Sequence, residues 1–309
     1  MLSNMPREDG LVKTENIREE ESLTKPAALL PKITTHFTIE LIIDTVCPHC
    51  YIGLKNLYAA IEIHKTRHPE ATFELVCSPL ILYPSALRSA HNKITYYTRT
   101  HGAQGSLFET WTRLGATVGI GFSWRGRTGN TRDSHKLLRF ALESIPTTMP
   151  STKFAQQPQQ RAATSPTTMT NATTETSSLR RGPALQMRLL EAIFRGYFEY
   201  DRDVSDQGFL VEVGTSVGAG VFTATDVREV LESENWGLAI DILSAKARAR
   251  LKVDAVPTVI VNGLSLYGGW QQPELFVAEF ERLRLGIPRD VSGGDGSGCS
   301  HCMAVGARY

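Results

Sequence analysis

The spacing of apolar residues divides the first part of the chain into a strand, a helix and a second strand. HFTIELIID (36–44) is rich in β-branched and aromatic residues, which favour a buried strand. From Cys47 onward, apolar residues recur at helical spacing to about Arg67–Pro69, and ATFELVCSPLILYP (71–84) predicts a second strand and its exit. The pattern therefore places the letters CPHC at the turn between a strand and a helix.

The middle of the chain has helical periodicity. NKITYYTRT and FETWTRLGATVG predict one or two helices, and the next helix can be capped by Asn130 or Thr131. Between two of these helices lies a segment dominated by Thr, Ser, Gln, Pro and Ala, residues 146–178, which predicts a flexible insertion. Further helices are expected over 130–145, 183–200, 206–218, 223–232 and 235–251.

Strand character returns near the end of the chain. VPTVIVNG (256–263) predicts a strand that pairs with LSLYGG as a hairpin, because Asn262-Gly263 is a strong tight-turn signal. A final helix is expected over 272–286, with Pro273 in its first turn.

Composition narrows the class of protein. The chain has 309 residues, a formal net charge of +1, 41% hydrophobic residues and 21% charged residues, as expected of a soluble globular protein. This balance favours neither nucleic acid nor an anionic membrane as a partner. No apolar run approaches the roughly 20 residues of a membrane span. The polar, acid-rich start matches neither a secretory signal nor a transit peptide, so a cytoplasmic location is expected.

The CPHC turn carries the most specific chemistry. A helix N-terminus stabilises a thiolate, and Cys47 is predicted at such an end. Cys50 lies three residues further along the same helix, near enough to close a disulfide after a modest adjustment. Pro48 suits a first helical turn, and His49, when protonated, favours the thiolate of Cys47. The four residues together suit thiol–disulfide exchange.

Two other interpretations of this pair remain open. The cysteines are two of five in the chain and could be buried structural thiols. They could also form a zinc site with Cys299 and Cys302, although those residues lie in a glycine-rich segment that predicts a disordered tail. A C-x-x-C beside a strand–helix–strand pattern favours a thioredoxin-like redox pair, and no metal site is predicted.

Val256-Pro257, far from the CPHC turn in the chain, provides an independent indication of a thioredoxin-like fold. Thioredoxin-type folds resume after an insertion with a proline that opens a strand, followed by a hairpin and a last helix, and VPTVIVNGLSLYGG has that form. In such folds the proline is cis and packs beside the CxxC. A cis Val256–Pro257 bond is therefore predicted.

These features resemble the DsbA-like thioredoxin superfamily, nearest its FrnE-type branch. The resemblance implies an α/β, thioredoxin-like fold with a helical domain inserted after the second strand, and residues 146–178 depart from the family pattern. The similar segments are DTVCPHCYIGLKNL, GNTRDSHKLLRFA, GYFEYDRDVSDQGFLVEVGTSVG and VPTVIVNGLSLYGGWQQPELF. The expected organisation is a disordered leader (1–35), a discontinuous thioredoxin-like domain (36–88 and 252–287), a helical insertion domain (89–251) and a glycine-rich tail with the letters CSHC (288–309).

The resemblance also implies an activity. The expected protein is a thiol–disulfide oxidoreductase in which Cys47 attacks a protein or small-molecule disulfide and Cys50 resolves the mixed disulfide. Val256 would offer backbone groups to an extended substrate, and Pro257 would shape the groove and block metal capture. No tightly bound cofactor is expected, and the protein is expected to be a monomer or a homodimer.

The main alternative function involves glutathione. Kappa-class glutathione transferases and 2-hydroxychromene-2-carboxylate isomerases resemble the same fold, use glutathione and typically carry serine at the position of Cys47. A glutathione-dependent transferase or isomerase therefore stays an alternative function, and glutathione is a candidate co-substrate. A third hypothesis is a non-catalytic partner protein that uses residues 146–178 for interaction.

Other polar residues allow two interpretations each. Asn130 and His135 would either line a cleft and contact substrate, or serve as helix caps and exposed polar positions. Asp44 would relay protons or satisfy the turn before Cys47, and Cys77 is expected to be a core thiol. Cys299 and Cys302 would pass electrons or bind a metal, or have no role.

Overall fold

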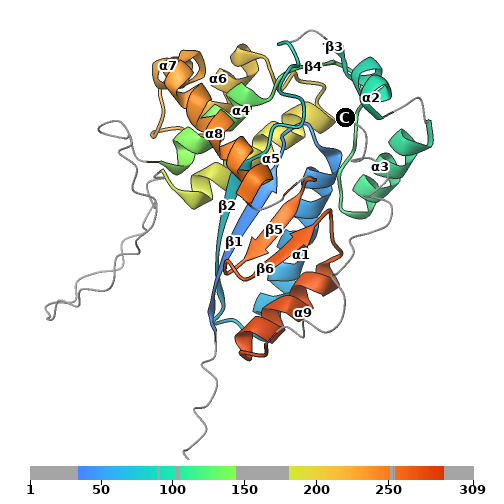
Figure 1. Ribbon diagram of the computed structural model, residues 1–309, viewed down its shortest axis with the longest axis vertical. Coiled ribbons are helices and arrows are strands. Elements are labelled where there is room, and N and C mark those ends of the chain that lie inside the picture. The colour runs from blue at the N-terminus through green and yellow to red at the C-terminus, as the bar shows by residue number, and fades with distance from the viewer. Residues whose placement is uncertain are drawn as a thin grey trace, which may run out of the picture. The chain divides into compact units, whose positions relative to one another are not determined.

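A computed structural model describes residues 34–88, 91–101, 105–143, 181–250, 253 and 255–288 (Figure 1). Residues 1–33 of the predicted leader, the whole 146–178 insertion and the tail residues 289–309, which include Cys299 and Cys302, lie outside these residues.

A four-stranded sheet with the strand order β2-β1-β5-β6 forms the centre of the fold. β1 pairs in parallel with β2 and antiparallel with β5, and β5 continues into β6 as an antiparallel hairpin. The central strand β1 places Ile39 opposite both Leu75 and Val261. The strands are β1 (His36–Ile43), β2 (Thr72–Pro79), β5 (Thr258–Val261) and β6 (Ser265–Gly268).

A run of helices separates β2 from β5 in the chain, as the sequence predicted. A two-residue ladder, β3 (His91–Asn92) with β4 (Arg127–Thr128), joins this region and was not predicted, because so short a pairing leaves no periodic signal. The helices are α1 (Pro48–Arg67), α2 (Lys93–His101), α3 (Gly105–Thr117), α4 (Arg132–Leu142), α5 (Pro183–Glu199), α6 (Gln207–Val217), α7 (Ala224–Glu232), α8 (Glu234–Arg250) and α9 (Pro273–Arg284).

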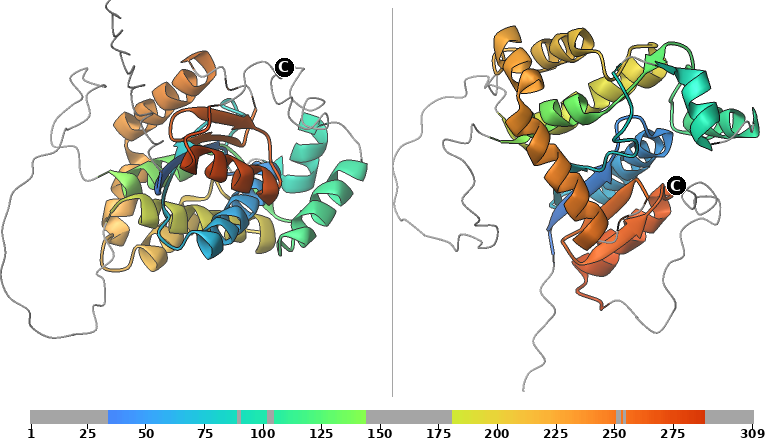
Figure 2. Two further views of the ribbon diagram at one scale, coloured as in Figure 1. Left: turned by 90° about the horizontal axis from the view of Figure 1, so that it is seen from below. Right: turned by 45° about the horizontal axis from the view of Figure 1, so that its top comes forward.

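α1 and α9 pack against each other over one face of the sheet (Figure 2). Phe37 of β1 lies on this face, because its ring contacts His64 of α1 and Phe280 of α9. The Phe37 ring stacks on Phe73 of β2, with ring centroids 4.9 Å apart, and meets Phe280 of α9 at 5.4 Å. Fully burying a phenylalanine stabilises a fold by about 1.5–3 kcal/mol, so this aromatic group anchors both helices to the sheet.

α5 lies against β2 and protects its backbone. The side-chain amide of Gln186 accepts a hydrogen bond from the Cys77 N–H and donates one to the Cys77 carbonyl, both at 2.9 Å. Gln186 is 1% exposed, so its amide can be buried only because both polar groups are satisfied. An edge strand with free N–H and C=O groups is prone to pair with another chain, and Gln186 occupies the N–H and C=O of Cys77 on this edge.

The hairpin between β5 and β6 follows its turn signal. Asn262 and Gly263 both have positive φ values, 52° and 66°, as a type I′ turn requires. The Asn262 side chain also accepts a hydrogen bond from the Thr38 N–H at 2.8 Å, which ties the turn to β1.

Within the described part of the chain, every helix is too short or too polar to cross a bilayer.

Candidate active site

Cys47 is the N-cap residue of α1, immediately after the turn that leaves β1. Pro48 occupies the first helical turn, where its missing N–H costs nothing. Cys47 makes no capping hydrogen bond. Its Sγ instead donates to the carbonyl of Val256, at 3.5 Å. The sulfur therefore lies between a helix N-terminus, which favours a thiolate, and a backbone segment brought in from the other half of the fold.

The Val256–Pro257 peptide bond is cis, which confirms the sequence prediction. Val256 and Pro257 are both buried and precede β5. Gly53 in α1 allows the close approach of this segment, since a Cβ at that position would lie 3.0 Å from Cγ of Pro257. Helix α1 thus contacts the Val256–Pro257 segment both at Cys47 and nearly two turns further on, at Gly53.

Gly53→Ala is expected to lower activity. In a helix interior alanine is more stable than glycine by about 0.5–1 kcal/mol, but here the new methyl group would press on Pro257. We expect no gain in the melting temperature and a loss of turnover of about tenfold, because small displacements in an active site are costly. Turnover and thermal unfolding measure the two effects.

Gly208→Ala in α6 is the matched control, because its Cβ would meet nothing closer than 3.5 Å. That variant should gain stability and keep full turnover. A Gly53→Ala protein with a raised melting temperature and unchanged turnover would argue against a functional contact between α1 and Pro257.

Cys50 lies beneath Cys47 and is completely buried, whereas Cys47 is 7% exposed. Burial raises the pKa of Cys50 well above its usual value, and the neighbouring Cys47 raises it further. Cys50 is therefore a thiol at neutral pH.

The third described cysteine, Cys77, is buried in β2, and burial raises its pKa to about 12, in agreement with the expected core thiol.

The His49 side chain contacts α3. The indole N–H of Trp111 donates to Nε2 of His49 at 3.1 Å. Because an indole N–H can only donate, Nε2 carries no proton in this arrangement. Protonation of His49, the form that would favour the thiolate of Cys47, requires this hydrogen bond to break.

Side chains from the helical insertion hold the turn before Cys47. The Thr45 hydroxyl hydrogen bonds with Ser134 of α4 at 2.7 Å, and the Tyr97 hydroxyl of α2 donates to the Val46 carbonyl. Sequence reasoning missed both contacts. They join residues far apart in the chain, and a serine or tyrosine within a helix gives no local signal of such a role.

Asp44 and His135 form a buried pair next to this turn. One oxygen of Asp44 accepts the Leu82 N–H at 2.7 Å, and the other lies 3.4 Å from Nε2 of His135. Asp44 is 0% exposed and His135 is 2% exposed. Asp44 thus accepts a hydrogen bond from the backbone of Leu82 with one oxygen, and its other oxygen has no hydrogen bond. His135 faces this oxygen from the protein interior, and its predicted contact with substrate stays a prediction.

The fold of this chain is similar to those of several solved protein structures. The chain is similar to the crystal structure of a probable DsbA oxidoreductase from Streptomyces coelicolor, with 21% sequence identity and a TM-score of 0.61. The match covers 84% of this chain and 95% of that protein. The fold is DsbA-like.

Two further solved structures are similar to the chain at lower scores. A 2-hydroxychromene-2-carboxylate isomerase matches with 13% identity and a TM-score of 0.49, over 81% of this chain and 96% of that protein. The cytosolic disulfide reductase DsbM from Pseudomonas aeruginosa, solved with glutathione, matches with 13% identity and a TM-score of 0.45, over 81% and 96%. No protein-family model matches the sequence. No curated protein matches it either.

Asn130 lies at the start of α4 in the DsbA-like fold. Its amide donates to the Pro84 carbonyl at 2.9 Å, and its side-chain oxygen accepts the Arg132 N–H at 2.8 Å. Thr131 is the N-cap residue but makes no side-chain cap. Asn130 therefore supports the loop before α4, as the capping interpretation expects, and it also borders a cavity of about 510 Å³.

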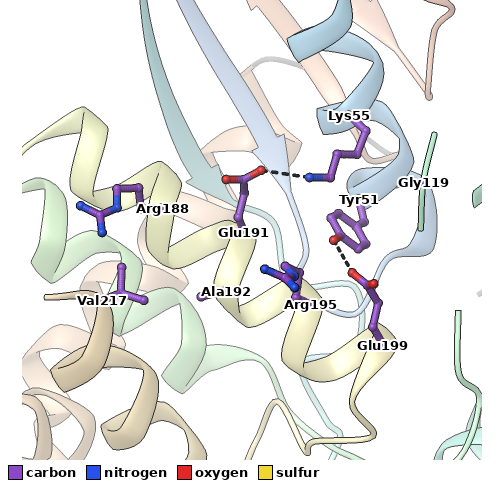
Figure 3. Close-up of a pocket in the computed structure, with 9 residues that line it drawn as sticks. All are labelled: Tyr51, Lys55, Gly119, Arg188, Glu191, Ala192, Arg195, Glu199 and Val217. Atoms are coloured by element: carbon purple, nitrogen blue, oxygen red, sulfur yellow. Dashed lines mark hydrogen bonds and ion pairs between the residues drawn. The ribbon is translucent and has the colours of Figure 1, made fainter. Parts of the chain in front are cut away.

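A second cavity, of about 470 Å³, lies between α1 and α5 (Figure 3). Tyr51, next to Cys50, donates to Glu199 at 2.6 Å, and Lys55 pairs with Glu191 at 3.1 Å. Burial and then Glu199 raise the pKa of Tyr51, so the phenol stays protonated. The lining is mainly charged, unlike the apolar lining that is typical of small-molecule sites.

Proposed function

We propose that this protein is a thiol–disulfide oxidoreductase in which Cys47 and Cys50 alternate between a dithiol and a disulfide. The observation that carries the proposal is the asymmetry of the pair. Cys47 lies at a helix N-terminus beside the Val256 carbonyl, whereas Cys50 is fully buried with a raised pKa. A nucleophile that keeps a small exposed area, 7% for Cys47, next to a fully buried thiol is an arrangement that suits two-step exchange.

The reductive direction proceeds in two steps. The Cys47 thiolate attacks one sulfur of a substrate disulfide, whose S–S bond breaks and releases one substrate thiolate. The mixed disulfide is then attacked by the Cys50 thiolate at the Cys47 sulfur, and the second substrate thiolate leaves. The substrate gains two electrons, and the Cys47–Cys50 pair becomes a disulfide. The same steps in reverse oxidise a substrate dithiol.

Asp44 supplies the base for the second step. Cys50 must lose its proton before it attacks, and burial makes that loss unfavourable. Asp44 is the buried acid of the same turn, and its charge adds to the pKa rise of Cys50. His135, 3.4 Å from the free oxygen of Asp44, positions this carboxylate and shares the transferred proton. This assignment combines both roles that the sequence allowed for Asp44.

Val256 binds the substrate backbone. Its carbonyl already accepts a hydrogen bond from the Cys47 thiol, and this donor is lost when Cys47 becomes a thiolate or a mixed disulfide. An extended substrate that supplies an N–H at this point restores the lost hydrogen bond. Protein segments and glutathione both carry suitable N–H groups next to a disulfide.

Trapping of thiols tests the proposal. The reduced protein is mixed with oxidised glutathione, quenched with acid, alkylated and analysed by mass spectrometry. We expect Cys47 to form a glutathione adduct that converts to a Cys47–Cys50 disulfide with release of reduced glutathione. Equal alkylation of Cys47 and Cys50, with neither adduct nor disulfide, would contradict the proposal.

A further inference from the structure

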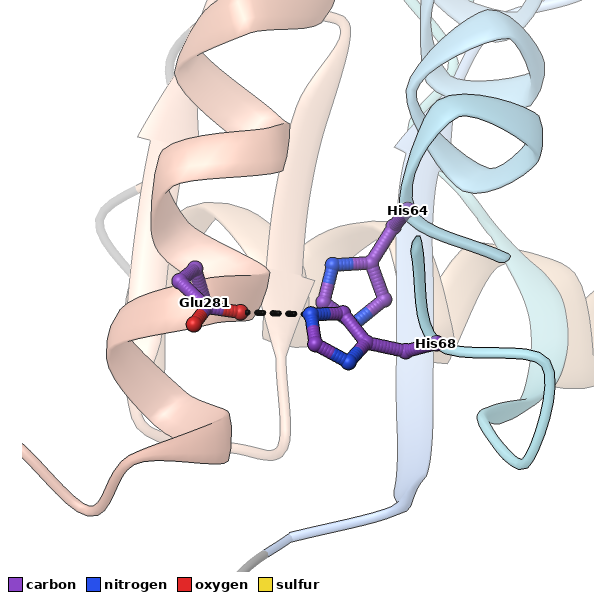
Figure 4. Close-up of side chains that lie close together, drawn as sticks. All are labelled: His64, His68 and Glu281. Carbon is purple, nitrogen blue, oxygen red and sulfur yellow. Dashed lines mark ion pairs between the residues drawn. The ribbon is translucent and has the colours of Figure 1, made fainter. Parts of the chain in front are cut away.

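Two histidines and a glutamate meet at the end of α1 remote from Cys47 (Figure 4). His64 and His68 are four residues apart, so their side chains lie on one face of the helix end. Glu281 comes from α9, which packs against α1. The rise of an α-helix puts this cluster about 25 Å along α1 from Cys47, well outside the proposed active site.

The geometry suits a small divalent metal ion. One nitrogen of each imidazole and one carboxylate oxygen lie within 4.8 Å of one another, and Nε2 of His68 is 3.0 Å from Oε2 of Glu281. A tetrahedral zinc shell, with bonds of about 2 Å, places its ligand atoms about 3.3 Å apart. Small side-chain movements therefore bring all three donors to one ion.

His64 provides an independent reason to look for a ligand. It is 1% exposed, and its Nε2 is buried without a hydrogen-bond partner. Edge contacts with Phe37, Phe73 and Phe280 hold the ring in place. A buried nitrogen without a partner costs about 1–3 kcal/mol, and coordination of a metal would satisfy an imidazole of this kind.

We propose that His64, His68 and Glu281 bind a divalent ion of the zinc type, with water completing the tetrahedron. Two imidazoles and one carboxylate are a common zinc ligand set. Arg284 donates to both oxygens of Glu281, at 2.7 and 2.8 Å. Each carboxylate oxygen has a second lone pair, so Arg284 becomes the outer partner that orients the ligand. The ion would clamp the end of α1 to α9.

An ion pair without metal is the simpler interpretation. His68 and Glu281 would then form a partly exposed salt bridge, and His64 would be an ordinary core side chain. Such a pair makes no use of His64 Nε2 and gives the three residues no common dependence on a metal. Binding of zinc alone separates the two interpretations.

The experiment titrates the full-length chain with Zn²⁺ against a chromophoric chelator. Thiols also bind zinc, so the background carries serine at four positions: Cys47, Cys50, Cys299 and Cys302. We expect one tight zinc ion per chain. Co²⁺ should bind with a tetrahedral spectrum and without a sulfur-to-cobalt charge-transfer band.

Three variants in this background identify the ligands: His64→Phe, His68→Asn and Glu281→Gln. Loss of an outer partner alone weakens a metal site by about 10–100-fold, so each loss of a ligand should weaken zinc binding by at least about tenfold. His36→Asn, which changes a histidine outside the cluster, should have no effect.

Two results would overturn the proposal: the background chain binds no zinc, or the three variants bind it as tightly as the background does. His64→Phe alters a buried residue, so its fold is checked by circular dichroism. His68 and Glu281 have side chains that are 20% and 38% exposed, and their variants carry the test if His64→Phe does not fold.

Discussion

Cys47→Ser should reduce turnover of a disulfide substrate by roughly 10³-fold or more, because removal of a nucleophile takes away the covalent step itself. A serine hydroxyl at the N-terminus of α1 is not ionised at neutral pH and cannot form the mixed disulfide. Insulin reduction and oxidation of a peptide dithiol both measure the loss.

Cys77→Ser is the matched control for this prediction. Cys77 is also buried and free, but it lies in β2 and its side chain has no part in the proposed exchange. Its substitution should leave turnover within about twofold of the original, although a buried hydroxyl costs some stability. Undiminished turnover by Cys47→Ser would refute the assignment of Cys47.

Cys50→Ser separates the two kinds of enzyme that the sequence left open. A dithiol oxidoreductase with this change forms the Cys47 mixed disulfide and then stops, so the adduct accumulates. A glutathione-dependent transferase or isomerase has no need of a resolving thiol and would keep its turnover.

Asp44→Asn should slow the resolving step by roughly 10²-fold at neutral pH, the size of effect typical of a general base. Asparagine keeps an oxygen that can accept the Leu82 N–H, so the turn is preserved. What the variant lacks is an acceptor for the Cys50 proton. Quench-flow analysis of the Cys47 mixed disulfide measures the step directly.

The pH dependence gives this prediction its sharpest form. The pKa of Cys50 is raised, so without a base the thiolate fraction, and with it the resolving rate, rises about tenfold per pH unit up to that pKa. The defect of Asp44→Asn should therefore shrink as the pH rises. Loss of the Asp44 charge also removes one contribution to the raised pKa of Cys50, which helps the variant at alkaline pH. If Asp44→Asn and the original protein resolve the mixed disulfide at equal rates at every pH, Asp44 is not the base and only stabilises the turn.

Local patterns were enough to predict the elements around the site. β1, α1 and the hairpin of β5 and β6 are each specified by residues near one another in the chain, such as Pro48 at a helix start and Asn262-Gly263 at a turn. The cysteine pair could also be predicted, because Cys47 and Cys50 are only three residues apart in the chain. The cis bond before Pro257 followed from the resemblance rather than from any local signal.

The contacts that hold the site together could not be predicted in this way. Ser134 on Thr45, and Gln186 on the backbone of Cys77, depend on how the insertion docks against the sheet. The burial of His135 is another example, since a polar residue on an amphipathic helix is most often exposed. Such roles are defined by tertiary packing, which one sequence does not encode in its periodicity.

The most direct test is a redox titration of the Cys47–Cys50 pair in glutathione buffers, with thiols trapped by alkylation and assigned by mass spectrometry. The proposed function predicts that both cysteines change state together, in one reversible two-electron transition, while Cys77 stays reduced. The midpoint potential then shows whether the protein acts as a reductant or an oxidant. A Cys47 that only exchanges with glutathione, while Cys50 remains a thiol at every potential, would contradict it.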